Sequence, residues 1–186
     1  VLVVSTGGAK KAISGLDRRT GATRWSFGDG SIEYQSPTVM TLGGREQVVV
    51  VSDKRLLGLD PVDGGLLWSQ QLPEDARTSS ATPTSAGGDR VLFFSGGEGL
   101  VYNVTADEGD FTVSEAYRTK NLGSTYALPV HHDGHLYGFK RSFLTCIDAA
   151  TGELRWKSRP PGGRGLLLVD DRLVVFGSEG NVVTAR

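Results

Sequence analysis

The chain has 186 residues, a formal net charge of −1 and 26 glycines. Its 20 basic residues are dispersed among 21 acidic ones without a basic patch, which disfavours binding to nucleic acid. No apolar run approaches the roughly 18–20 residues of a membrane-spanning helix, and the single cysteine, Cys146, excludes an internal disulfide.

Short apolar runs recur along the chain and predict buried strands. They lie at 2–4, 48–51, 91–94, 136–139 and 173–176. Each run is too short for a buried helix, is rich in Val, Leu and Phe, and is bounded by polar turns, as is typical of strands. Pro37, Pro83 and Pro129, spaced 46 residues apart, each open a further short strand. Cys146 falls in a later strand, where we expect a small buried side chain.

One motif recurs three times: an aspartate, a glycine four residues later and a tryptophan four residues after that. The copies are Asp17-Gly21-Trp25, Asp60-Gly64-Trp68 and Asp148-Gly152-Trp156. The first two tryptophans are 43 residues apart, and the third follows after 88, about twice that spacing. Asn103, Asp107 and Phe111 fill the intervening slot and predict a degenerate copy.

A repeat of about 43 residues with four short strands predicts an all-β fold, a β-propeller of four-stranded antiparallel blades. Helical repeats of this length need amphipathic runs of ten or more residues, and the sequence contains none. We expect complete blades at 33–72, 79–119 and 124–158 and partial blades at 1–27 and 165–186. Because propellers close with roughly four to eight blades, we expect the chain to be a portion of a longer protein.

The repeated motif resembles the tryptophan-docking motif of the quinoprotein-like propellers, or PQQ-type repeat family, over nearly the whole chain. The resemblance implies a ring of six to eight blades, so that the remaining blades are partners of this portion. It also implies a bacterial, extracytoplasmic and periplasmic protein in which each tryptophan packs between adjacent blades. Replacing Trp68 or Trp156 with alanine should then cost roughly 3–5 kcal/mol, as for other buried aromatics.

The polar clusters of the chain do not predict catalysis or a metal site. His131, His132 and His135 surround an Asp-Gly turn, but adjacent strand residues point to opposite faces and cannot easily share one ion. No serine or glycine-rich segment has the strand–turn–helix setting of a nucleophile elbow or phosphate loop. The basic residues at 155–159 are interpreted as a solvated outer strand.

Binding is expected at the channel mouth, where loops lead into the innermost strand of each blade. Equivalent polar and aromatic side chains in these loops could converge on one pocket, although such loops are also polar simply because they are exposed. The candidates are Glu33, Tyr34, Gln35, Arg77, Ser79, Ser124, Tyr126 and Arg164. Tyr and Arg are the better candidates because they dominate binding hot spots.

The sequence therefore favours a non-catalytic propeller that presents a protein- or ligand-binding surface, like the scaffold members of the family it resembles. No cofactor is evident. One alternative is part of an alcohol or sugar dehydrogenase with PQQ and Ca²⁺ in its channel. The family's vicinal cysteine pair and acidic metal ligands are not found in these blades. A second alternative is the sensory or binding domain of a larger multidomain protein.

Overall fold

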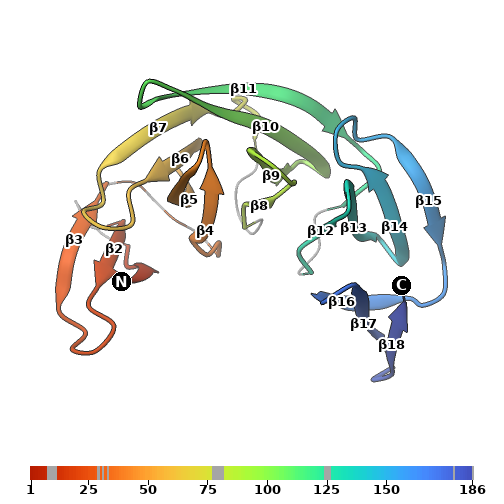
Figure 1. Cartoon of the computed structure of the whole chain (residues 1–186). Helices are drawn as coiled ribbons and strands as arrows, with labels where there is room; N and C mark the ends of the chain where they lie inside the picture. Colours follow the sequence, from red (N-terminus) through yellow and green to blue (C-terminus); the bar gives the residue numbers. More distant parts are fainter. Residues whose placement is uncertain are drawn as a thin grey trace. The chain divides into compact units, whose positions relative to one another are not determined.

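The computed structural model of this chain describes residues 1–7, 12–28, 30, 32, 34–76, 82–123, 127–177 and 179–185, with Arg164 by its backbone alone. The regular structure of this part is entirely β-strand (Figure 1). No described segment forms a helix long and apolar enough to cross a membrane.

The described strands form five sheets, and within each sheet the strands that are neighbours follow one another in the chain (Figure 1). Two sheets have three strands: β1 (Leu2–Ser5), β2 (Ile13–Leu16) and β3 (Thr23–Phe27); and β16 (Gly163–Val169), β17 (Arg172–Gly177) and β18 (Val182–Ala185). Three sheets have four strands: β4 (Thr38–Leu42), β5 (Arg45–Ser52), β6 (Arg55–Leu59) and β7 (Leu66–Gln71); β8 (Thr84–Ser85), β9 (Arg90–Ser95), β10 (Glu98–Asp107) and β11 (Asp110–Thr119); and β12 (Val130–His132), β13 (His135–Lys140), β14 (Phe143–Asp148) and β15 (Leu154–Ser158). This up-and-down order confirms the predicted all-β fold with propeller blades.

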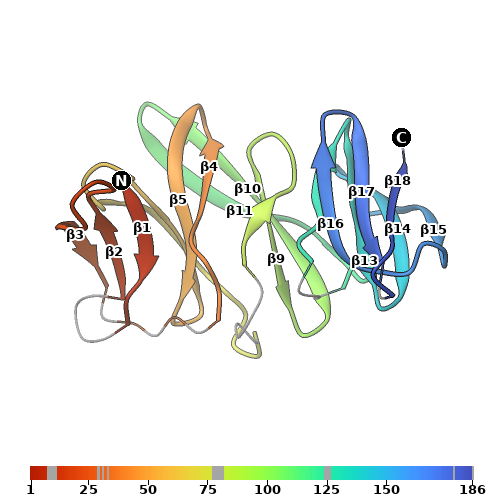
Figure 2. The ribbon, with the colours of Figure 1, turned by 90° about the horizontal axis from the view of Figure 1, so that it is seen from below.

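The chain divides into two compact units. Unit 1 contains Val1–Pro83 and Asn103–Ser114, and unit 2 contains Thr84–Tyr102 and Glu115–Arg186. In unit 1, side chains of β2 and β3 pack against those of β5 and β6 around Ile13 and Trp25. In unit 2, β13 and β14 pack against β16 and β17, which lie side by side in Figure 2. Each core is thus formed between two neighbouring sheets.

The apolar runs at 48–51 and 91–94 form strands that are buried on both faces, as predicted, whereas in the runs at 2–4 and 173–176 Leu2 is 53% and Phe176 41% exposed. All four valines at 48–51 are at most 1% exposed, although successive residues of a strand point to opposite sides. The run 91–94 on β9 is buried in the same way. A strand that contacts apolar neighbours on both faces reads as a continuous hydrophobic run rather than as an alternating one.

The slot between the second and third motifs differs from its prediction. β10 and β11 are ten residues long each and meet at a tight turn, where Glu108 and Gly109 have φ angles of 49° and 98°. Asn103 lies within β10 and Phe111 within β11, so neither belongs to an aspartate–glycine turn. The prediction of a degenerate copy is therefore wrong, because a long hairpin replaces the motif.

Tyr117 on β11 makes the contacts that the tryptophan of the first motif makes. In unit 1 the Trp25 indole donates to the carbonyl oxygen of Pro61 at 3.2 Å, and a Cβ on Gly64 would lie 2.5 Å from its ring. In unit 2 the Tyr117 hydroxyl donates to the carbonyl of Ala149 at 3.0 Å, and a Cβ on Gly152 would lie 2.5 Å from its ring. In each case the accepting carbonyl belongs to the residue after a motif aspartate.

The three motif tryptophans are not equally buried. Trp25 and Trp68 are 7% and 4% exposed, but Trp156 is 42% exposed. The expectation that Trp156 is as deeply buried as Trp68 is therefore wrong for the described structure. Trp156 contacts the ring of Tyr137, with centroids 6.1 Å apart.

Candidate functional site

Most of the predicted mouth residues lie outside the described part of the chain. Glu33, Arg77, Ser79, Ser124 and Tyr126 are not described, and Arg164 is placed in β16 by its backbone only. Tyr34 and Gln35 are described, and they differ sharply. Tyr34 is 87% exposed, whereas Gln35 is 5% exposed and its buried Oε1 accepts no hydrogen bond. An unpaired buried acceptor costs about 1–3 kcal/mol.

The loop that carries these two residues is held to the segment before β8, within unit 1. The amide of Ser36 donates to the Thr82 hydroxyl at 3.1 Å, and the Thr38 hydroxyl donates to the carbonyl of Pro83 at 3.0 Å. Both segments lead into the first strand of their sheets, β4 and β8. The segments that enter consecutive innermost strands therefore lie side by side here, as a mouth surface requires.

The turn of each tryptophan motif is built around its aspartate. In the third copy Asp148 accepts hydrogen bonds from the amides of Ala150 and Thr151 at 2.8 and 3.0 Å, and from Arg155 at 2.6 Å. Arg155 and these amides lower the pKa of Asp148 to about 2. Gly152 closes the turn with φ +76°, a conformation that glycine adopts without steric cost.

In the first two motifs the aspartate is also paired with an arginine, but the position of that arginine differs between them. Asp17 is bonded to Arg24, seven residues later, which matches the spacing of Asp148 and Arg155. Asp60 has Leu67 at that spacing and is paired instead with Arg45 of β5. Backbone amides and these arginines lower the pKa of Asp17 and of Asp60. The ionised carboxylate is therefore a structural part of all three turns.

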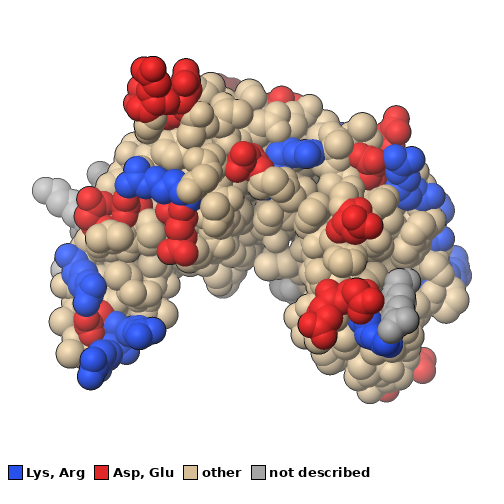
Figure 3. Space-filling model, in the orientation of Figure 1, with Lys and Arg blue, Asp and Glu red and all other residues tan. Residues whose placement is uncertain are grey.

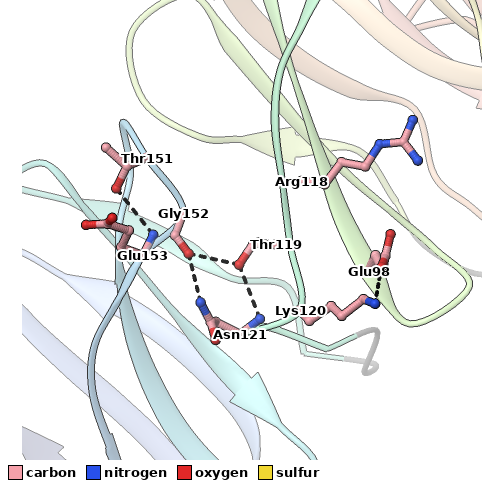
Figure 4. A pocket seen from close by; sticks show the side chains of 8 residues that line it. All are labelled: Glu98, Arg118, Thr119, Lys120, Asn121, Thr151, Gly152 and Glu153. Carbon is pink, nitrogen blue, oxygen red and sulfur yellow. Dashed lines mark hydrogen bonds and ion pairs between the residues drawn. The ribbon is translucent and has the colours of Figure 1, made fainter.

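In unit 2 the third turn forms one wall of a groove of about 490 Å³, drawn in Figure 4. The opposite wall is the end of β11 and the two residues after it. The hydroxyl of Thr119 and the side-chain amide of Asn121 both donate to the carbonyl oxygen of Gly152 at 2.9 Å. These bonds form the floor of the groove and fix the turn against β11.

Charged side chains of both signs line the groove. Lys120 is paired with Glu98 at 3.0 Å, and Arg118 lies further along the wall (Figure 4). Arg118 makes two hydrogen bonds of 2.8 Å with Glu115. Glu153 contributes a second carboxylate from the turn. A groove with paired charges and exposed hydrogen-bonding groups fits a polar surface of a partner better than an apolar ligand.

The histidine cluster does not converge on one point. His131 lies against Gly87, and burial lowers its pKa. His132 and His135 are paired across the β12–β13 hairpin, and His135 Nδ1 is 2.7 Å from the carbonyl of Asp133. Across the residues that the structure describes, no group of three or more His, Cys, Asp or Glu side chains could hold a metal ion.

The structural roles of Tyr117 and Gln47 were not predicted from the sequence. Tyr117 follows Trp68 by 49 residues rather than 43, so a strict period misses it. Gln47 is fully buried and accepts a hydrogen bond from the Trp68 indole, while its own amide donates to the carbonyl of Leu42 at 2.8 Å. A two-residue alternation of Phe111, Val113, Tyr117 and Thr119 along β11 was the available signal for Tyr117.

A family model described as outer membrane protein assembly factor BamB matches residues 1–142. No curated protein matches the chain. Among solved structures, BamB from Moraxella catarrhalis is 18% identical with a TM-score of 0.61, and the match covers 93% of this chain and 57% of that one. The computationally designed protein Ika8 is 16% identical with a TM-score of 0.62, and the match covers 96% of this chain and 53% of that one.

A europium-containing methanol dehydrogenase is 12% identical with a TM-score of 0.54, and the match covers 92% of this chain and 43% of that one. At these identities the structural likeness shows the fold alone. The chain spans little more than half the length of the first two structures.

Proposed function

The chain belongs to the PQQ-like repeat β-propeller family whose model is described as outer membrane protein assembly factor BamB, and on that premise we propose that it is a non-catalytic propeller that binds a protein partner. The binding surface in this proposal is the channel mouth, with Tyr34 as its exposed anchor. Its place is the periplasm, in keeping with the outer-membrane assembly role in the family's description.

The observation that carries the proposal is the contrast between Tyr34 and Gln35. An 87% exposed tyrosine offers a rigid ring and a hydroxyl to a partner, and tyrosine is enriched at binding hot spots. The neighbouring Gln35 has a buried oxygen without a donor. A partner that covers the Tyr34 ring would remove its exposed apolar surface from water, whereas the enclosed Gln35 oxygen lies out of a partner's reach.

Site-specific cross-linking in the native host tests the proposal. A photoreactive phenylalanine derivative replaces Tyr34 in the full-length protein, and the matched control replaces Val62, which is 75% exposed in the β6–β7 turn of the same unit. We expect an envelope protein to be cross-linked at position 34 at least about fivefold more than at position 62, because hot-spot residues lie at the interface centre. Equal yields at the two positions would refute a mouth-centred surface.

A stability control accompanies this experiment. Changing Tyr34 to alanine should leave the free energy of unfolding within about 0.5 kcal/mol of the wild type, because exposed side chains contribute little to stability. The same change combined with alanine at Arg77 and Tyr126 should weaken partner binding further. Loss of folding in the triple variant would show that these residues are structural and would count against the proposal.

A further inference from the structure

A second, smaller hollow of about 330 Å³ adjoins the groove of Figure 4 within unit 2. It shares Lys120 and Asn121 with that groove, but every charged residue that lines it is a cation. We call it the basic hollow, defined by Lys120, Lys140, Arg141 and Lys157. Figure 3 shows Lys and Arg side chains gathered along the edge of unit 2 where β15 runs.

Neutral groups, not carboxylates, hold Lys140 and Lys157 in place. The Lys140 ammonium donates to the carbonyls of Gly97 and Leu122 at 3.1 and 3.3 Å. The Lys157 ammonium lies 5.6 Å from the centroid of the Phe143 ring, and a second cation, Arg159, lies 5.2 Å from it. Carbonyls and an aromatic face orient positive charge but do not neutralise it.

Arg141 occupies a backbone conformation that does not favour it. Its φ is +56°, in the turn between β13 and β14, a left-handed region that residues other than glycine seldom adopt. Among the residues that the structure describes, Lys120 is the only cation of the hollow that forms an ion pair, with Glu98 at 3.0 Å. Lys140, Arg141 and Lys157 thus keep their charge uncompensated in a chain whose net charge is −1.

The spread of the cations decides which anion fits. They come from the segment after β11, from the end of β13 with the turn that follows it, and from β15, so they reach the hollow from three separate parts of the chain. Among the neutral donors on its wall, the Thr145 hydroxyl donates to the carbonyl of Phe143, and one of the two amide N–H groups of Asn121 donates to Gly152. A single compact oxyanion needs several convergent donors, whereas carboxylates spaced along a peptide match separate cations. Leu154 adds an apolar contact for such a peptide.

We propose that the basic hollow binds an acidic segment of a partner protein. This inference rests on the proposed protein-binding function and adds the chemistry of the partner's segment. The bound segment is extended enough to reach cations on three elements and carries at least two carboxylates. Its attachment depends on salt, because the cations are solvent-accessible.

Fluorescence anisotropy with the full-length protein and a labelled peptide of alternating Glu and Asp tests this inference at 0.15 M salt. Arg141→Gly removes one cation and suits the left-handed backbone. Lys54→Gly is the matched control, since Lys54 also has a positive φ, +58°, in a strand–strand turn, but in unit 1. We expect Arg141→Gly to weaken the peptide about threefold, as for exposed charge pairs, and Lys54→Gly to leave it unchanged.

The double variant Arg141→Gly/Lys157→Gln should weaken binding about tenfold if the two contributions add. Unfolding curves of Arg141→Gly should match or exceed the wild type, which separates lost binding from lost folding. Equal affinities of the Arg141 and Lys54 variants would overturn the proposal, as would binding of pyrophosphate without binding of the peptide. Cross-linking at Tyr34 is independent of these outcomes, so failure here leaves the mouth-centred function standing.

Discussion

Replacing the first and third motif tryptophans with alanine separates the structural roles of two residues that look identical in sequence. Trp25 is 7% exposed, lies in the core of unit 1 and donates to the Pro61 carbonyl at 3.2 Å. Trp156 is 42% exposed and has one ring contact, with Tyr137. Because both lie on the last strand of their sheets, β3 and β15, the two substitutions are made at equivalent places in the motif.

The expected costs differ by about a factor of two. Trp25→Ala removes a buried indole, leaves a cavity between two sheets and leaves the Pro61 carbonyl without its donor. We therefore expect the free energy of unfolding to fall by about 4 kcal/mol. Trp156→Ala removes a ring that is already partly exposed to solvent. Its loss exposes roughly half as much apolar surface and leaves no closed cavity, so we expect a loss of about 2 kcal/mol.

Urea unfolding followed by far-ultraviolet circular dichroism measures both changes without relying on tryptophan fluorescence. The free energy of unfolding of each variant is compared with that of the wild type under the same slope. Equal losses for the two variants would refute the reasoning. That result would mean that the Trp156 ring is covered in solution to the same degree as the Trp25 ring.

Three further predictions concern turns and buried polar groups. Gly64→Ala should lower the free energy of unfolding by about 3 kcal/mol, because the new Cβ would collide with the Trp25 ring and the left-handed backbone would be strained. Gly44 has an equal φ with open space around it, so Gly44→Ala should cost about 1 kcal/mol. Urea unfolding compares the two variants. Asp148 has a folded pKa of about 2 against an ordinary value of 3.8, so its contribution to stability is complete above pH 4 and is lost as pH falls towards 2. Asp148→Asn should flatten the acid limb of the stability–pH curve, and an unchanged limb would contradict this role. Gln47→Ala should cost about 2–3 kcal/mol by leaving a buried indole N–H and a carbonyl unpaired, and a loss below about 0.5 kcal/mol, the range of surface substitutions, would show that water replaces the amide.

The sequence predicted features that depend on local chemistry. An aspartate that accepts its own downstream amides and a glycine with positive φ form the same turn wherever they occur, so Asp17, Asp60 and Asp148 are recognisable from spacing. Short apolar runs likewise predicted the buried inner strands. These signals are contained within ten residues of chain and do not need the neighbouring sheet.

Features that depend on long-range contacts were not predictable in the same way. The alternation along β11 marks Tyr117 as an inward-facing residue, but its likeness to Trp25 is seen only in its contacts with Ala149 and Gly152. The basic hollow shows the same limit. The basic residues at 155–159 are predicted from the sequence to lie on a solvated outer strand. That Lys120 and Arg141 line one hollow with Lys157 depends on the packing of separate strands and cannot be predicted from local sequence.

The exposure of Trp156 accompanies a difference in the residue opposite it, in addition to the contacts with Pro61 and Gly64 that cover the Trp25 ring. Trp25 and Trp68 are paired across the strands with Gly15 and Gly58, and a Cβ on either glycine would overlap the indole. Trp156 is paired with Cys146, whose side chain occupies that space. The glycine ten residues before the tryptophan therefore lets the ring fold back over the sheet. A motif of aspartate, glycine and tryptophan fixes the turn, and the two tryptophans with a glycine opposite them are the two that are buried.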